Sequence, residues 1–237
     1  PHYRYLIENK LQMATKFKTL FYDIETDDRG DGIEVGRDQI ISYAAIDQNK
    51  KVYYYSGDEK KLLEHFHRTI GDYDVIAGWN SDRFDGPYLR KRAQKHGVKF
   101  FDFYHTQQVD LLQRFQELYH KDQAVAQGIR SYKLENVATY FLGSGKIPRN
   151  STWDMFINAP DKLKEYNIRD VEILRQLEEK LGIIAQDIVK GNVLNSHINA
   201  KVSGAALDLY AVHFANSRGI HLKTTPRLSR DSFSDNS

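Results

Sequence analysis

The sequence predicts an α/β fold in which helices flank a mixed β-sheet. Short runs with β-type patterning and longer runs with helical periodicity alternate after an opening group of strands, which is the order typical of layered α/β proteins. The chain has 237 residues, of which 41% are hydrophobic, and this is enough to fill a core. It has no cysteine, so neither disulfides nor thiolate metal ligands contribute to the fold.

The strands come mainly in the first half of the chain, as short β-type or apolar runs separated by polar turns. They are expected at Lys18–Glu25, Gln39–Ile46, Val52–Tyr55, Val75–Trp79 and Phe100–Tyr104. Residues 27–38 contain five acids and three glycines and therefore predict a loop directly after the first strand.

The helices show apolar residues at helical spacing, and glycines at 97 and 143 suit two of their C-termini. Helices are expected at 59–70, 88–96, Asp110–Tyr119, Ser131–Leu142 and Pro160–Lys180, the last with proline at its start. We expect an N-terminal flank at 1–17, a main domain at 18–190, a helical extension at 191–226 and a weakly ordered polar tail at 227–237.

The charge of the chain is nearly balanced, with a formal net charge of +2. Any binding of nucleic acid must therefore come from local patches. The basic residues Arg90, Lys91, Arg92, Lys95 and Lys99 form one such patch, which either follows a phosphate backbone or is the solvated face of a helix. No apolar run approaches the roughly 18 residues of a membrane helix, so no membrane partner is expected.

Asp23 and Glu25 lie two residues apart at the end of the first predicted strand. Side chains at this spacing project from the same face of a strand, where two carboxylates repel each other. A magnesium ion, which prefers oxygen ligands, would offset that repulsion. The alternative is an exposed acidic strand end without a ligand.

Two further segments carry polar residues that are candidates for a functional site. Asn80 and Asp85 follow a buried strand and open a helix, where they serve either a catalytic site or a turn and a helix cap. Tyr166 and Asp170 share one face of the long helix, because residues four apart are neighbours on a helix. A surface Tyr–Asp pair is the alternative there.

The ordered set of these three elements resembles the exonuclease domain of family B DNA polymerases, in the DEDDy branch of the ribonuclease-H-like nucleases. Phe21–Thr26 resembles the first exonuclease motif, Asn80–Asp85 the second and Tyr166–Asp170 the third. The segments Tyr88–Arg92 and Ser131–Gly143 are similar to phage and archaeal members. The resemblance implies a ribonuclease-H-like mixed sheet with a C-terminal helical extension.

The position of the tyrosine distinguishes two branches of this group. The related histidine branch carries its histidine five residues before the last aspartate, where this chain has Glu165. The resemblance extends over roughly residues 3–215, and the polymerase metal motifs are absent from the sequence. We therefore expect an excised domain, a piece of a split polymerase or a stand-alone nuclease.

The resemblance also implies a role for each motif residue. Asp23, Glu25 and Asp170 would hold one of two divalent metal ions, Mg²⁺ or Mn²⁺, and Asp23 would bridge to the second, which Asp85 helps to hold. Tyr166 would orient the attacking water through its hydroxyl. The implied reaction is 3′→5′ hydrolysis of the terminal phosphodiester, which releases nucleoside 5′-monophosphates during proofreading.

Substrate-binding residues follow from the same resemblance and from residue chemistry. Bases of a single strand stack on aromatic side chains, so Trp79 and Phe84 are candidates, with core packing as the alternative. Asn80 is expected near the terminal nucleotide, the backbone N–H of Thr26 near the 3′ end, and Lys146 near the scissile phosphate, although a solvated loop lysine is the alternative for Lys146. The expected partners are a single-stranded DNA 3′ end or primer-template and the polymerase remainder, in the cytoplasm, the nucleoid or a viral replication site.

Two alternative functions stay open at the level of sequence. A nuclease of the same fold would act on RNA or in repair, since discrimination of the 2′-hydroxyl depends on the shape of the pocket. A catalytically inactive domain would instead bind single strands or a partner protein. The presence of all four acids and the tyrosine argues against that inactive domain.

Overall fold

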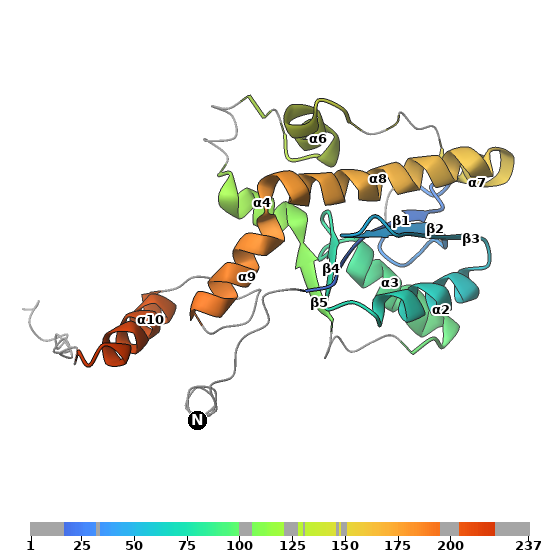
Figure 1. The fold of residues 1–237 in the computed structure, drawn as a ribbon. Coiled ribbons are helices and arrows are strands. Elements are labelled where there is room, and N and C mark those ends of the chain that lie inside the picture. The colour runs from blue at the N-terminus through green and yellow to red at the C-terminus, as the bar shows by residue number, and fades with distance from the viewer. Residues whose placement is uncertain are drawn as a thin grey trace, which may run out of the picture.

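A computed structural model shows a five-stranded mixed sheet in the order β3-β2-β1-β4-β5 (Figure 1). The strands are β1 (Thr19–Thr26), β2 (Ile40–Asp47), β3 (Val52–Ser56), β4 (Val75–Gly78) and β5 (Gln107–Asp110). β1 pairs antiparallel with β2 and parallel with β4, so β1 is the central strand of the sheet. The structure describes residues 17–31, 34–99, 106–120, 128–129, 131–145, 147, 151–194 and 204–220.

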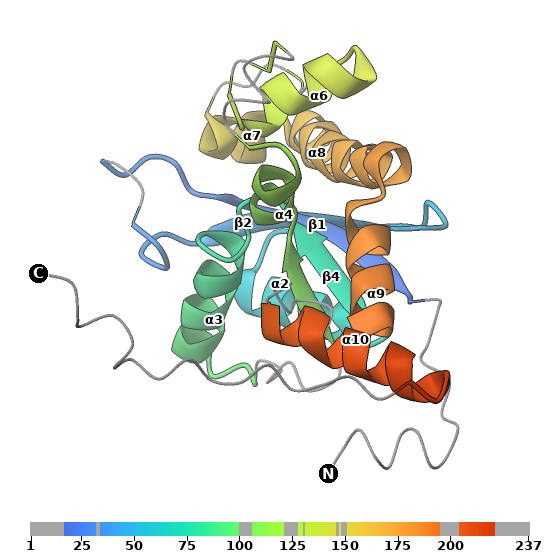
Figure 2. The same ribbon diagram turned by 90° about the vertical axis from the view of Figure 1, so that its left-hand side faces the viewer.

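Helices cover both faces of this sheet. They are α2 (Glu59–Ile70), α3 (Asp85–His96), α4 (Leu111–Leu118), α6 (Leu134–Leu142), α7 (Thr152–Asn158), α8 (Pro160–Leu181), α9 (Ile183–Leu194) and α10 (Gly204–Ser217). α8 crosses one face over β1 and β2, with α6 and α7 packed against it, while α2 and α3 lie on the other face (Figures 1 and 2). The fold class predicted from the sequence is confirmed.

Alternation along β1 explains why the sheet has two cores. Leu20, Tyr22 and Ile24 are buried in the cluster shared with α2 and α3. Phe21 points to the opposite face and packs with residues of α8. Asp23 lies two residues after Phe21, so its side chain projects from the same face of β1, toward α8.

Most of the predicted elements are observed with small shifts at their ends. The helix expected at Ser131–Leu142 begins only at Leu134, and the one expected at 88–96 begins earlier, at Asp85. The strand expected at Phe100–Tyr104, the tail at 227–237 and nearly all of the N-terminal flank lie outside the described residues. β5 and the short helix α7 were not predicted.

A buried ion pair anchors the loop that follows β1. Glu59, at the start of α2, accepts hydrogen bonds from the guanidinium of Arg92 on α3 and from the backbone N–H of Ile40 at 2.7 Å. Arg92 also donates to the carbonyl of Arg37, at 3.1 Å. Arg92 is only 4% exposed, so it is not part of a solvated basic face, and the patch hypothesis fails for this residue.

Candidate active site

Three carboxylates from two elements meet between the sheet and α8. Asp23 and Glu25 come from β1, and Asp170 comes from α8; each offers an oxygen atom, and these atoms lie within 4.8 Å of one another. Glu25 and Asp170 are buried, at 5% and 0% exposure. The predicted same-face arrangement of Asp23 and Glu25 is therefore observed, and α8 adds the third acid.

The end of β1 is shaped to bring these groups together. A register shift lies between Glu25 and Thr26, because Glu25 pairs with Ser42 whereas Thr26 pairs with Ile40. The extra residue on β2 is Ile41, whose side chain packs with Tyr166 of α8. Bulges of this kind often re-aim side chains beside functional sites. Tyr166 itself is 4% exposed and contributes to the pocket wall.

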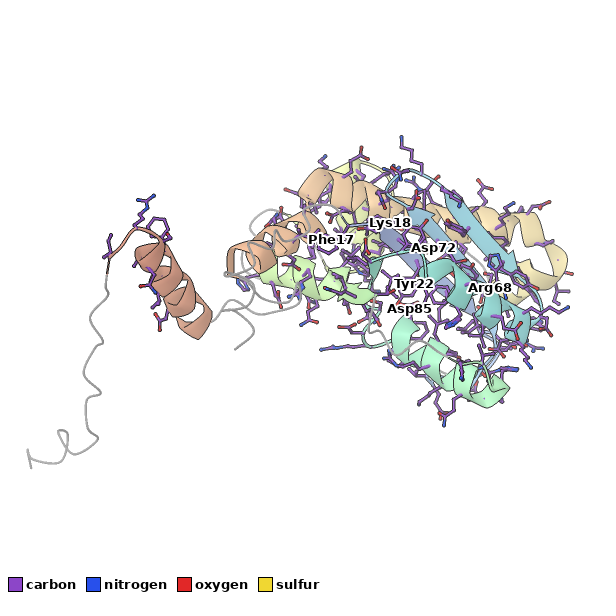
Figure 3. All side chains as sticks on the ribbon, turned by 60° about the horizontal axis from the view of Figure 1, so that its bottom comes forward. Phe17, Lys18, Tyr22, Arg68, Asp72 and Asp85 are labelled. Atoms are coloured by element: carbon purple, nitrogen blue, oxygen red, sulfur yellow. The ribbon has the colours of Figure 1, made fainter. Side chains whose placement is uncertain are left out.

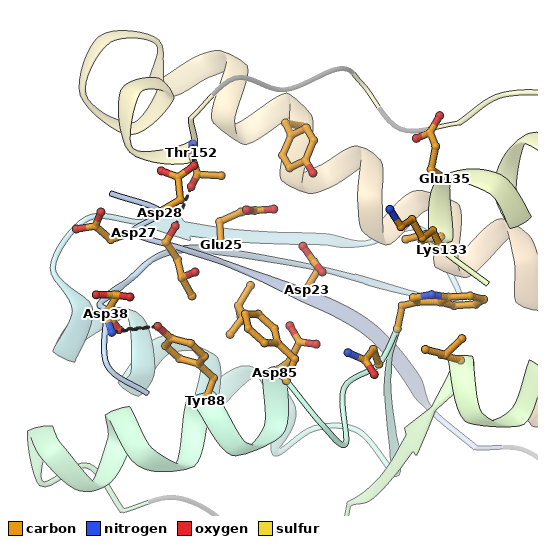
Figure 4. A pocket seen from close by; sticks show the side chains of 18 of the residues that line it. Asp23, Glu25, Asp27, Asp28, Asp38, Asp85, Tyr88, Lys133, Glu135 and Thr152 are labelled. Carbon is orange, nitrogen blue, oxygen red and sulfur yellow. Dashed lines mark hydrogen bonds between the residues drawn. The ribbon is translucent and has the colours of Figure 1, made fainter. Parts of the chain in front are cut away.

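Asp85 approaches the same space from the first turn of α3. Pairing of β1 with β4 ends at Phe21, so the backbone of β1 beyond that residue is not covered by a neighbouring strand. The backbone N–H of Ile24 interacts there with the carboxylate of Asp85. Asp23 and Asp85 thus point into one pocket from different elements (Figure 4).

Burial dominates the electrostatics of Asp85. Burial, and then the nearby charge of Asp23, raises the pKa of Asp85 well above its usual range, although two backbone N–H groups favour its ionised form. Tyr22 of β1 lies close to Asp85 (Figure 3), and burial followed by the charge of Asp85 likewise raises the pKa of Tyr22. A divalent cation would offset this concentration of negative charge.

The turn between β4 and α3 carries Asn80 in a left-handed conformation, with φ of 64°. Asparagine tolerates this region better than most residues, which explains its place in the turn. The carbonyl of Asn80 accepts the backbone N–H of Phe84, at 3.0 Å, and closes the turn. Asp110, which caps α4, also accepts the backbone N–H groups of Asn80 and Asp82, at 3.0 and 3.2 Å.

These elements surround a pocket of about 1160 Å³. Seven of its lining residues are acids, and Lys133 is the one basic residue among the described lining residues. Figure 4 shows Lys133 on the side of the pocket opposite Asp28 and Thr152. The pocket is slightly larger than ordinary small-molecule sites, which measure roughly 300–1,000 Å³.

Trp79 and Phe84 both line the pocket and both also pack against core clusters. The indole N–H of Trp79 donates to the carbonyl of Tyr132 at 3.1 Å, which fixes the plane of the ring. Phe84 packs against Tyr88, with ring centroids 5.3 Å apart. Both side chains are half-buried, so each combines packing with an accessible surface.

The loop after β1 and the start of α7 form another wall. Asp28 accepts hydrogen bonds from the backbone N–H groups of Thr152 and Trp153, at 2.8 and 3.1 Å. The hydroxyl of Thr152 donates to the carbonyl of Thr26 at 2.8 Å. The guanidinium of Arg29 lies 3.5 Å from the centroid of the Trp153 ring. These contacts attach α7 to the end of β1.

The structure gathers most of the residues that the sequence indicated. The following line the one pocket: Asp23, Glu25, Thr26, Trp79, Asn80, Phe84, Asp85 and Tyr166. Asp170 joins the acidic cluster behind that lining. Lys146 lies outside the described residues.

Three residues that contact the site were missed in the sequence. Asn167 donates from its side-chain amide to Asp23 Oδ2 at 3.1 Å, and Ser42 donates to Asn167 Oδ1, also at 3.1 Å. Asp110 organises the turn of Asn80. Asn167 is adjacent to Tyr166 in the third motif, which was the only sequence signal available for it.

The residues present fit a divalent metal ion. The described cluster offers only carboxylate oxygens, and hard cations such as Mg²⁺ and Mn²⁺ take such ligands. Burial of like charges is costly unless a cation or a proton compensates it. Asp23, Glu25 and Asp170 are therefore the residues that would hold a metal, with Asp85 nearby.

Comparison with known proteins identifies the family. A family model described as the RNase H superfamily matches residues 20–182, which is more than half of the chain. The chain belongs to the RNase H superfamily. This membership agrees with the mixed sheet and with acids placed on its central strand and on the helix across it.

Sequence relatives of this RNase H-like chain include archaeal DNA polymerases. Those of Archaeoglobus fulgidus and Sulfurisphaera ohwakuensis are 34% and 33% identical over 85 and 132 residues, which are 35% and 50% of this chain. That of Methanocaldococcus jannaschii is 26% identical over 209 residues, 71% of this chain. The matched segments span only 11% to 15% of the three relatives' lengths.

The fold is also that of part of a solved polymerase. The structure of the family B DNA polymerase from the hyperthermophilic archaeon Pyrobaculum calidifontis matches with a TM-score of 0.66 and 18% identity, over 90% of this chain and 32% of that one. The family model, the relatives and this match together support the resemblance to the exonuclease domain of family B polymerases. Within the described part of the chain, no helix combines the length and the hydrophobicity needed to cross a membrane.

Proposed function

We propose that this chain is a metal-dependent 3′→5′ exonuclease domain that removes nucleotides from single-stranded or frayed DNA ends. The observation that carries the proposal is the cluster of Asp23, Glu25 and Asp170 at the wall of a pocket that Asp85 enters from the other side. Relatives named as DNA polymerases support a proofreading role beside a polymerase. We extend this role to a site of DNA replication in the cytoplasm, nucleoid or a viral replication complex.

Two divalent ions at such a site would activate a water molecule and neutralise charge at phosphorus and at the leaving oxygen. Asp23, Glu25, Asp85 and Asp170 are the residues that we assign to their binding. Tyr166, whose side chain borders the pocket, would orient the attacking water by a hydrogen bond from its hydroxyl. No nucleophilic side chain is required for this reaction.

The remaining lining residues suit a strand end rather than a duplex. Trp79 and Phe84 offer half-buried aromatic surfaces on which bases of any type can stack. Asn80 and Thr26 offer polar groups for the terminal nucleotide, and both line the pocket. We keep Lys146 as a candidate contact for the scissile phosphate. Trp79, Phe84, Asn80 and Thr26 are the other candidate substrate contacts.

The test uses a 5′-labelled single-stranded DNA oligonucleotide with Mg²⁺, with Mn²⁺ or with a chelator. We expect a metal-dependent ladder that shortens from the 3′ end, lost in Asp23→Asn and retained in the control Asp72→Asn. Asp72 is exposed in the turn after α2 and does not line the pocket. A matched RNA oligonucleotide and a 3′-blocked DNA separate the substrate classes and the direction of attack.

Absence of cleavage by folded wild-type protein with either metal would overturn the proposal. Internal cuts without a 3′ ladder would contradict the direction of attack. Preferential degradation of the RNA oligonucleotide would replace DNA as the substrate class. Equal loss of activity in Asp72→Asn and Asp23→Asn would show that the acidic cluster has no special role.

A further inference from the structure

A buried polar chain joins three elements of the fold behind the acidic cluster. Ser42 lies on β2, directly opposite Glu25 in the β1–β2 register, so its side chain shares the face that carries the acids. Asn167 lies on α8 between Tyr166 and Asp170 in the sequence. Ser42 and Asn167 are both 0% exposed. The Ser42 hydroxyl donates to Asn167 Oδ1, and Asn167 Nδ2 donates to Asp23 Oδ2, each at 3.1 Å.

The chemistry of these groups determines which atom donates and which accepts in the two hydrogen bonds. An ionised carboxylate only accepts hydrogen bonds, so the amide of Asn167 contacts Asp23 through its NH₂ group. The amide oxygen then faces Ser42, whose hydroxyl is able to donate. A flipped amide would place two acceptors against each other at Asp23. The orientation of Asn167 is therefore determined by its two partners and not only by packing.

This contact leaves Asp23 able to bind a cation. A carboxylate has about four lone-pair sites, and the amide of Asn167 occupies one of those on Oδ2. Glu25 and Asp170 repel Asp23 within a space where their nearest oxygens lie within 4.8 Å. The hydrogen bond from Asn167 to Oδ2 opposes rotation of the Asp23 side chain away from these acids. Asn167 holds it in place from the buried side.

We propose that Asn167, itself anchored by Ser42, is a positioning residue that fixes Asp23 for binding of a divalent metal ion. This inference rests on the proposed function, because it assigns a role to groups beside the same acids. Groups that orient metal ligands in this way are usually worth about 10- to 100-fold in metal affinity or activity. Loss of Asn167 should therefore weaken the binding of the metal more than the binding of DNA.

The decisive measurement is the Mn²⁺ affinity of the full chain without DNA. Mn²⁺ is titrated into the protein, and electron paramagnetic resonance reports the concentration of free Mn²⁺. Asn167→Leu keeps a similar volume and removes the donor. We expect its Mn²⁺ affinity to fall by about 10- to 100-fold. Ser42→Ala leaves the donor but frees the amide, so a smaller loss of the same kind is expected.

The matched control is Asn158→Leu. Asn158 also donates from its amide to an aspartate, Asp154, at 2.7 Å, but this pair is exposed at the end of α7 and lies outside the pocket. Its Mn²⁺ affinity should equal that of the wild type. At saturating Mn²⁺, the KM for the oligonucleotide should be unchanged in Ser42→Ala and Asn167→Leu, and raised Mn²⁺ should restore much of the rate.

Thermal melting in chelator tests whether each variant is folded. A folded Asn167→Leu with wild-type Mn²⁺ affinity would overturn the inference. If Asn167→Leu shows no cooperative melting, Ser42→Ala replaces it in the test. A folded Ser42→Ala with wild-type Mn²⁺ affinity would then overturn the inference. If the wild type binds Mn²⁺ but degrades no oligonucleotide, the proposed function fails, while weaker Mn²⁺ binding in the variants still supports the role of Asn167.

Discussion

The carboxylate of Asp110 accepts a hydrogen bond from the backbone N–H of Asn80 at 3.0 Å. The two residues are 30 positions apart: Asp110 is the last residue of β5, and Asn80 lies in the turn that follows β4, the parallel neighbour of β5. The same carboxylate accepts from Asp82 and caps α4 through Leu112 and Gln113. One buried aspartate thus ties the turn before Asp85 to the start of another helix.

Asp110→Ala is expected to lower exonuclease activity together with stability. Four backbone N–H groups would lose their acceptor, and loss of an N-cap alone typically costs about 0.5–2 kcal/mol. Because small misplacement of catalytic groups lowers rates by up to about 100-fold, we expect a fall in kcat of about 10- to 100-fold. Urea unfolding and single-turnover kinetics at saturating metal measure the two effects separately.

Asp58→Ala is the control for this prediction. Asp58 caps α2 by accepting the backbone N–H of Lys61, but it does not line the pocket. It should lose a similar cap energy, about 0.5–2 kcal/mol, and keep its activity. Equal kcat in the Asp110 and Asp58 variants would mean that Asp110 has only a structural role.

The buried pair of Glu59 and Arg92 predicts a pH dependence of stability. Burial alone would raise the pKa of Glu59, but hydrogen bonds from Arg92, Ile40 and His96 outweigh it and lower this pKa. Because the pKa is lower in the folded state, the stabilisation is fully present above the unfolded value of about 4.3 and is lost as the pH falls through the folded value. Loss of one partner of a buried pair costs about 3–5 kcal/mol.

Glu59→Gln should therefore be less stable than the wild type near neutral pH and should approach it in acid. Urea unfolding at several pH values between about 3 and 7 measures this convergence. Glu179→Gln breaks an exposed pair with Arg175 and should change stability by no more than about 1 kcal/mol at any pH. A constant difference between wild type and Glu59→Gln down to acid pH would contradict the prediction.

The attachment of α7 makes a third prediction. Hydrogen bonds from Ser151, Thr152 and Trp153 outweigh burial and lower the pKa of Asp28, so its carboxylate is held ionised at the start of the helix. Asp28→Ala should destabilise the chain by about 0.5–2 kcal/mol and speed hydrogen exchange of the amides of Thr152 and Trp153. Unchanged exchange at these two amides would show that α7 is held by its other contacts.

Local patterning predicted the parts of the fold that depend on neighbours in sequence. The β-type run of β1 and the apolar spacing of α8 are properties of single segments, so these elements were expected almost at their observed bounds. β5 was missed because its sequence, Gln107–Asp110, has one apolar residue, Val109. It becomes a strand by pairing with β4, which a single segment does not reveal.

The same distinction applies to the candidate site. The acids and Tyr166 carry a spacing that indicates their role, and they were found in the sequence. Asp110 and Asn167 act through partners 30 and 144 residues away, so their contacts depend on the finished fold. In the sequence, Asp110 has the position of an ordinary helix cap, and Asn167 is a polar residue inside a helix. Many aspartates and asparagines occupy such positions.

A last prediction concerns the free-energy cost of an ionised Asp85 in the folded protein. Asp85 and Asp161 both lie in the first turn of a helix, where the helix dipole favours a negative charge. Asp161 is exposed, whereas Asp85 is 3% exposed and faces Asp23. Burial, and then the charge of Asp23, raises the pKa of Asp85 despite the two backbone N–H groups that favour its charged form.

Replacement by asparagine should therefore act with opposite sign at the two positions. In chelator, Asp85→Asn removes a poorly compensated buried charge and should raise the Tm by at least about 2 °C, the shift that about 1 kcal/mol gives in a domain of this size. Asp161→Asn loses a favourable dipole interaction of about 0.3–1 kcal/mol and should lower the Tm slightly. Addition of Mg²⁺ should stabilise the wild type and the Asp161 variant more than Asp85→Asn, and only Asp85→Asn should lose exonuclease activity. A lower Tm for Asp85→Asn in chelator would mean that its hydrogen bonds to the backbone, and not its desolvated charge, dominate the energetics of the site.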